Sequence, residues 1–130
     1  MTGNLIAYLG CTTEFRKWEG FTYDPATKKA YTAISSIERG MLNNEAKRDL
    51  GGPNHIKVKE NKCGCVMEFD MDDSMSATKA RMLTCGKYVN DDAEAVGRFK
   101  DSCDTDLIAN PDNVAMISEF KQVRADCHAQ

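Results

Sequence analysis

The sequence predicts a mainly β fold in which short strands are joined by turns and by two long loops. Apolar and polar residues alternate in several short runs, as they do in strands that have one buried face. Clusters of Asp, Asn, Gly and Pro separate these runs, and helical spacing of apolar residues persists in few places. With 42% hydrophobic and 28% charged residues, the 130-residue chain is long enough to form a single domain, residues 1–130, with its own core.

A β-hairpin is predicted near the N-terminus. Its strands are Phe21–Pro25 and Ala30–Ile34, and the turn between them spans Asp24–Lys29. From Ile37 to Lys62 the charge density rises and neither the strand period nor the helix period persists. This segment is therefore predicted as a long loop, with one short helix near Leu42–Leu50.

A second hairpin is predicted in the middle of the chain. Cys65–Met71 has the composition of a strand, Asp72–Ser74 is a turn-forming cluster, and Arg81–Cys85 returns antiparallel. A short helix then follows from Asp91, which is suited to cap it, to near Cys103.

The last predicted strand is Asn113–Ser118, and the tail from Phe120 onward is a helix candidate. The order of elements is strand, strand, long loop, strand, strand, long loop, strand. This is the order of one four-stranded β-propeller blade, enlarged by its long loops, followed by the first strand of the next blade. Because neighbouring blades normally cover the edges and faces of a blade, those of this chain are expected to be covered by a protein partner, through self-association or in a larger host assembly, or to be removed by a rearranged fold.

Two of the predicted inner strands begin alike. Glu19–Tyr23 and Asp112–Met116 each start with an acidic residue, continue with a small or amide residue and then alternate apolar and polar positions. If the two strands are equivalent, each directs a carboxylate at the central channel of a propeller, where oxygen ligands hold hard cations such as calcium. The alternative is that Glu19 and Asp112 are ordinary carboxylates at turns or strand edges.

The cysteines form an even set and leave the redox compartment open. They are Cys11, Cys63, Cys65, Cys85, Cys103 and Cys127. The single residue between Cys63 and Cys65 is a tighter spacing than that of a zinc knuckle, and no second knuckle follows. Cys65 and Cys85 are therefore interpreted as small, half-buried strand residues, and the disulfide state of the set stays open.

Charge and hydropathy argue against a nucleic-acid partner and against a transmembrane segment. The net charge of −3 and the pI near 5.4 leave no basic surface of the kind that nucleic acid attracts, so no nucleic-acid partner is expected. No apolar stretch approaches the roughly 18 to 20 residues of a transmembrane segment.

Several motifs resemble those of the PhoX-type alkaline phosphatases. The first follows the pattern "EG…YDP…Y.AIS", and the last follows "CD.D.IANPDN". The motifs occur in the order of the family over roughly residues 7–118. They are Leu9–Pro25, Tyr31–Ser35, Gly40–Met41, Gly51–Ile56, Cys63–Val66 and Cys103–Asn113.

The resemblance implies a β-propeller whose central site holds calcium and iron bridged by carboxylates. Such an enzyme hydrolyses phosphate monoesters and is usually exported, to the periplasm or the extracellular space. Carried over by position, Glu19 and Asp112 are the expected metal ligands and Asn113 lies beside them as a support. Glu38, near the end of the second strand, is a further candidate ligand.

The sequence also departs from the family. It has no counterpart of the upstream segment that supplies an iron-ligating cysteine, and Asn110 stands where characterised members have a phosphate-contacting arginine. We therefore expect a fragment or remnant of a metal-dependent phosphomonoester hydrolase that is inactive as this chain alone. The alternative is a non-catalytic structural or binding subunit derived from the same fold.

Overall fold

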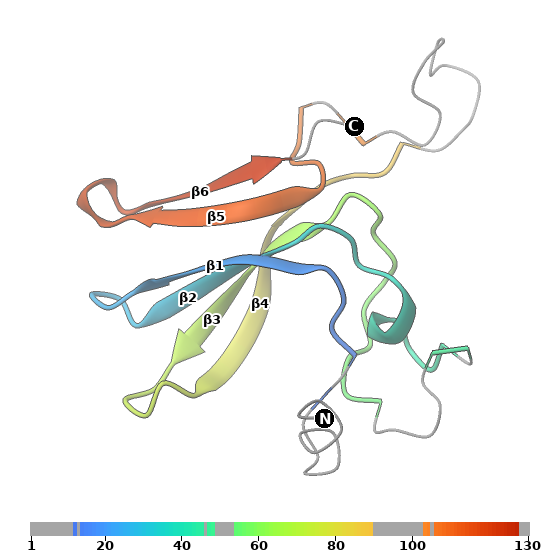
Figure 1. The fold of residues 1–130 in the computed structure, drawn as a ribbon, viewed down its shortest axis with the longest axis horizontal. Helices are drawn as coiled ribbons and strands as arrows, with labels where there is room; N and C mark the ends of the chain where they lie inside the picture. Colours follow the sequence, from blue (N-terminus) through green and yellow to red (C-terminus); the bar gives the residue numbers. More distant parts are fainter. Residues whose placement is uncertain are drawn as a thin grey trace.

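The described part of the chain forms two antiparallel sheets (Figure 1). The computed structural model describes residues 12, 14–45, 47–48, 54–89, 103–104 and 106–127. These residues form strands and 3-10 turns, and no α-helix occurs among them. The elements are β1 (Trp18–Asp24), β2 (Lys29–Ile34), η1 (Arg39–Met41), β3 (Cys65–Met71), β4 (Ala77–Cys85), β5 (Pro111–Ile117), η2 (Ser118–Phe120) and β6 (Gln122–Cys127).

Strands β1 to β4 form a four-stranded sheet in which each strand pairs with the next. Both predicted hairpins of this sheet are confirmed. The β1–β2 turn is closed by the buried Asp24, whose carboxylate accepts hydrogen bonds from the backbone N–H of Ala26 (3.0 Å) and the hydroxyl of Thr27 (2.6 Å). Strand β3 has the predicted bounds, whereas β4 begins at Ala77, four residues before the predicted start at Arg81.

One face of this sheet packs against the long loop after β2. Ile34, Met67 and Phe69 from the sheet form a buried cluster with Ile37 and Met41 from the loop. Backbone hydrogen bonds hold the loop in place, including those exchanged by Ile37 and Asn61, both 2.9 Å. The described part of the predicted long loop thus covers one side of the sheet.

The opposite face carries the second sheet. Tyr31, Ala33 and Val66 form a second buried cluster with Val114 of β5. Partly buried residues of β5 and β6 pack against the same cluster, so the β5–β6 hairpin is stacked on the β1–β2 end of the larger sheet. In Figure 1, β5 lies alongside β1 and the two strands run in the same direction.

The structure corrects the prediction at the C-terminus. The tail from Phe120 was expected to be helical, but Gln122–Cys127 is strand β6, paired antiparallel with β5. Its apolar residues Val123 and Ala125 alternate with polar ones, and both face the core cluster. The chain therefore supplies two strands where the sequence predicted only the first.

Neither of the two predicted short helices is seen among the described residues. The part of Leu42–Leu50 that the structure describes, residues 42–45 and 47–48, forms turns, and the nearest helical segment is the 3-10 turn η1. Residues 46, 49 and 50 lie outside the described residues, as do residues 91–102 of the helix predicted from Asp91 to near Cys103. The described sheets do not close into a ring of blades.

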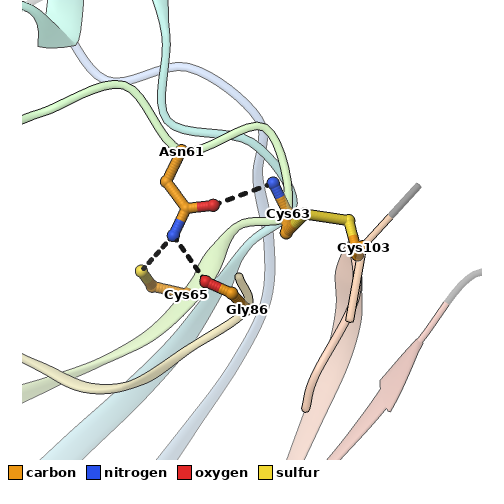
Figure 2. The surroundings of a disulfide bond; sticks show 5 residues. All are labelled: Asn61, Cys63, Cys65, Gly86 and Cys103. Atoms are coloured by element: carbon orange, nitrogen blue, oxygen red, sulfur yellow. Dashed lines mark hydrogen bonds between the residues drawn. A yellow bond between two sulfur atoms is a disulfide. The ribbon is translucent and has the colours of Figure 1, made fainter. Parts of the chain in front are cut away.

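Two disulfides brace the sheet (Figure 2). Cys65 and Cys85, which were interpreted as small strand residues, are bonded to each other across β3 and β4. Cys63 is bonded to Cys103 and so ties the start of β3 to the segment that leads into β5. Gly64, which lies between Cys63 and Cys65, has a φ of +73°, a backbone conformation that glycine adopts without strain.

The Asn61 side chain fixes the backbone around this pair of bonds. Its amide oxygen accepts a hydrogen bond from Cys63 N–H (2.9 Å), and its amide nitrogen donates to the carbonyl of Gly86 (2.8 Å), as Figure 2 shows. The turn before β3 is thereby joined to the end of β4.

Candidate functional site

The first predicted ligand, Glu19, lies at the start of β1, next to an irregularity in the sheet. The β1–β2 register shifts between Trp18 and Phe21, the stretch that contains Glu19. Such bulges re-aim side chains and are common next to binding sites. The half-buried Glu19 carboxylate accepts a hydrogen bond from the Ser35 hydroxyl (3.4 Å). Glu19 is thus displaced from the regular alternation of its strand.

The second predicted ligand, Asp112, lies at the start of β5 in a similar position. The β5–β6 register shifts between Pro111 and Asn113, so Asp112 also lies at an interruption of regular pairing. Its carboxylate accepts a hydrogen bond from the side-chain amide of the exposed Asn113 (3.3 Å). Asn113 therefore contacts the Asp112 carboxylate, and its role as a support for a metal ligand stays a prediction.

The strands that carry these two residues touch at equivalent positions. A Cβ atom added to Gly20 would lie 2.8 Å from the Cα atom of Asn113 and 2.8 Å from the nitrogen of Val114, so only glycine allows this approach. Further along, Met116 N–H donates to the Thr22 hydroxyl (3.1 Å). Gly20 and Asn113 hold the same place in the two similar stretches of sequence, Glu19–Tyr23 and Asp112–Met116. The structure places these two residues side by side.

The remaining candidate ligand, Glu38, is bonded to residues other than Glu19 and Asp112. It precedes η1, and its carboxylate forms an ion pair with Arg16 (2.8 Å) and accepts a hydrogen bond from the Ser36 hydroxyl (3.2 Å). Its negative charge is thus already balanced by a protein cation.

The side chains that most often ligate metals do not cluster among the described residues. Nowhere among them do three His, Cys, Asp or Glu side chains come close enough together to hold a metal ion. A structural or catalytic cation normally has more ligands than two carboxylates provide. Glu19 and Asp112 would therefore hold calcium only together with further oxygen ligands.

A cluster of charged side chains around the buried Glu68, on β2, β3 and β4, was not predicted from the sequence. Glu68 is 5% exposed and forms ion pairs with Lys29 (2.6 Å) and with Arg81. Lys29 also pairs with Asp70 (2.7 Å). Glu68, Asp70, Lys79, Ala80 and Arg81 line an open pocket of about 290 Å³. The charged groups here largely satisfy one another, which favours a structural role for the cluster.

A second buried carboxylate, Glu14, anchors the long loop. It accepts hydrogen bonds from the backbone N–H groups of His55 (3.0 Å) and Ile56 (2.7 Å). No pattern in the sequence indicates this contact, because it joins segments about 40 residues apart. Its role is to close the loop over the sheet.

The disulfides bear on the compartment in which the chain matures. Disulfides of this kind are typical of proteins that fold under oxidising conditions. Among the residues that the structure describes, no helix has the length and apolar character needed to cross a membrane.

Comparisons with protein-family models, with curated proteins and with solved structures yield no match for the chain.

Proposed function

We propose that this chain is a segment of a PhoX-like metallophosphatase fold that contributes two carboxylates to a calcium site and does not hydrolyse phosphate monoesters on its own. The observation that carries the proposal is the equivalence of Glu19 and Asp112. The strands that bear them lie side by side at Gly20 and Asn113, and both residues lie where strand pairing is interrupted. Two local features of the sequence thus recur in matching places of the fold.

The arrangement of the sheets supports this proposal. In a propeller, each blade is a four-stranded antiparallel sheet, and the inner strand of the next blade packs on its face. Here β1 to β4 form such a sheet, and β5 stacks against β1 and β2. We infer that β1 and β5 are the inner strands of two successive blades.

The chemistry of the residues also fits a hard cation. Carboxylate oxygens of Glu19 and Asp112 are ligands that calcium prefers, and the Asn113 amide would orient the second of them. In an intact site, Glu19 and Asp112 would help to hold calcium, with iron beside it as the family resemblance implies, and the ions would supply charge that neutralises and orients a phosphate monoester. Because Glu38 is paired with Arg16, it is the weaker candidate as a ligand.

Calcium titration calorimetry tests the proposed site. We expect weak calcium binding by the chain and its loss in the Glu19→Gln/Asp112→Asn double variant. A matched control, Glu60→Gln/Glu119→Gln, removes two exposed carboxylates from other parts of the chain and should bind as the unmodified chain does. Equal binding by all three proteins would remove the site.

The absence of catalysis is tested separately. With calcium present and p-nitrophenyl phosphate as substrate, the chain alone should show no turnover. Its described residues bring no three His, Cys, Asp or Glu side chains together to hold a metal ion, and Asn110 stands where family members have a phosphate-contacting arginine. Turnover that survives purification to homogeneity would overturn this part of the proposal.

A second candidate function is a docking subunit that no longer takes part in catalysis, and the open sheet edges favour it. Strand β4 is exposed along most of its length, and Phe21 and Phe120 are 54% and 66% exposed. A protein partner covering these edges would bury them. Under either function, the two disulfides support an exported, periplasmic or extracellular protein.

A further inference from the structure

Strand β6 has an outer edge that no described strand covers. It pairs with β5 on one side, and the two-stranded sheet ends there. The unpaired N–H and C=O groups of such an edge are a template for another strand. The chemistry of the β6 side chains indicates which strand it would accept.

The residues of β6 are complementary to a second, antiparallel copy of themselves. When two copies pair about Ala125, Arg124 of each copy faces Asp126 of the other, and Val123 faces Cys127. Opposite charges directly across two strands are favourable, and so are apolar pairs on the other face. The register therefore gives two Arg–Asp pairs on one face and an apolar row on the other.

The groups that would make these pairs are accessible. Arg124, Asp126 and Cys127 are exposed, and no described residue forms an ion pair with Arg124 or Asp126. Val123 and Ala125 are half-buried on the face that packs on the core. Pairing would thus extend the packed face of the hairpin without displacing an existing ion pair.

The other edge strands of the fold do not share this property. Strand β4 carries Lys79 and Arg81 and no acidic residue, so two copies of it would bring like charges together. Strand β1 carries Glu19 and Asp24, strand β5 carries Asp112, and neither strand has a basic residue. Charge complementarity therefore assigns a second copy of the chain to β6.

We propose that the chain forms a two-fold symmetric homodimer by antiparallel pairing of β6 with β6 of a second copy, centred on Ala125. The two hairpins then form one continuous sheet in the order β5–β6–β6–β5. The interface is isologous and closes on itself, so it yields a dimer and no longer assembly. This inference rests on the docking function proposed above, and it identifies the partner as a second copy.

Charge reversal tests the pairing through the oligomeric state, measured by analytical ultracentrifugation. Arg124→Asp and Asp126→Arg should each weaken the dimer at least tenfold, because each places like charges opposite each other twice. The double variant Arg124→Asp/Asp126→Arg restores opposite charges and should restore the dimer. Lys79→Asp on β4 is the matched control and should leave the dimer unchanged. Circular dichroism checks that every variant is folded.

Disulfide trapping tests the register. Facing residues of antiparallel strands have Cα atoms about 4.5 to 5.5 Å apart, which a disulfide spans. Oxidised Val123→Cys should therefore form a covalent dimer with Cys127 of the second copy, and Val123→Cys/Cys127→Ser should not. Ala125→Cys should cross-link to itself whether or not Cys127 is present.

The outcomes separate this inference from the docking function. A dimer that ignores the charge reversals and forms neither cross-link overturns pairing through β6 and leaves docking through another surface. A monomer that co-purifies with a different protein also overturns the pairing and keeps the docking function. A monomer without any partner overturns both.

Discussion

At the scale of single residues, Glu68 is a buried charged group of β3 that contacts side chains of β2 and β4. The strand register places Tyr31 of β2 and Arg81 of β4 on either side of it, and Lys29 reaches the same carboxylate. A buried charge without a partner is strongly unfavourable, whereas paired cations and a tyrosine hydroxyl make its burial tolerable. The register of these three strands thus brings the members of the cluster together.

Removing the Glu68 carboxylate should therefore destabilise the chain. We expect Glu68→Ala to lower the free energy of unfolding by about 2 kcal/mol, because Lys29 and Tyr31 lose a buried partner. Urea unfolding followed by tryptophan fluorescence measures the change. The control is Asp73→Ala, which removes the exposed partner of Lys28 and should have no measurable effect. Similar losses in both variants would show that Glu68 has no special role.

At the scale of elements, the sequence predicts those parts of the fold that local patterns determine. The β1–β2 hairpin follows from alternation and from a turn that Asp24 closes within its own segment. The tail was misassigned because Gln122–Cys127 alternates over a stretch too short to exclude a helix, and pairing with β5 decides its conformation. The similarity of Glu19 and Asp112 could be found from the sequence because the same local pattern occurs twice along the chain.

Contacts between distant segments could not be predicted in the same way. The Glu68 cluster depends on the register of β2, β3 and β4, and the Glu14 contacts depend on how the long loop folds back. The cysteine pairing likewise follows from strand positions: Cys65 and Cys85 are register partners, which no spacing rule indicates.

The disulfides should contribute to stability according to the length of chain that each one closes. Cys65–Cys85 closes 20 residues and Cys63–Cys103 closes 40, so loop entropy predicts losses of about 3 and about 4 kcal/mol when each pair is replaced by serine. Denaturant unfolding of the two double-serine variants measures these losses. A loss near zero for either pair would contradict the estimate.

At the scale of the whole molecule, the charged groups define the pH range of stability. Hydrogen bonds from the Lys29 ammonium hold the pKa of Asp70 below its usual range, and bonds from Ser74 and Ser76 do the same for the pKa of Asp72. Burial, together with the nearby Glu68 carboxylate, raises the pKa of Tyr31. Hydrogen bonds to Asp70 and Glu68 raise the pKa of Lys29.

Stability should accordingly fall at both ends of the pH scale. The lowered carboxyl pKa values stabilise the fold above the unfolded-state pKa of about 4, and this contribution is lost as the pH falls below it. The raised pKa values of Lys29 and Tyr31 stabilise the fold up to about pH 10, and this contribution is lost as the pH rises further. Urea unfolding from pH 2 to pH 11.5, with Cys127 alkylated, should show a plateau between. Tyr31→Phe should reduce the alkaline slope, and an unchanged slope would exclude Tyr31 as its source.

The close spacing of Cys63 and Cys65 has a consequence for how the protein matures. Only Gly64 separates Cys63 from Cys65. During oxidation, Cys63 can therefore also react with Cys85, and Cys65 can also react with Cys103. The swapped isomer, Cys63–Cys85 with Cys65–Cys103, has the same mass and would place Cys85 two residues out of register with its strand partner. Thiol–disulfide exchange must resolve such an isomer before β3 and β4 can pair correctly. The rate of oxidative maturation should therefore depend on a disulfide isomerase.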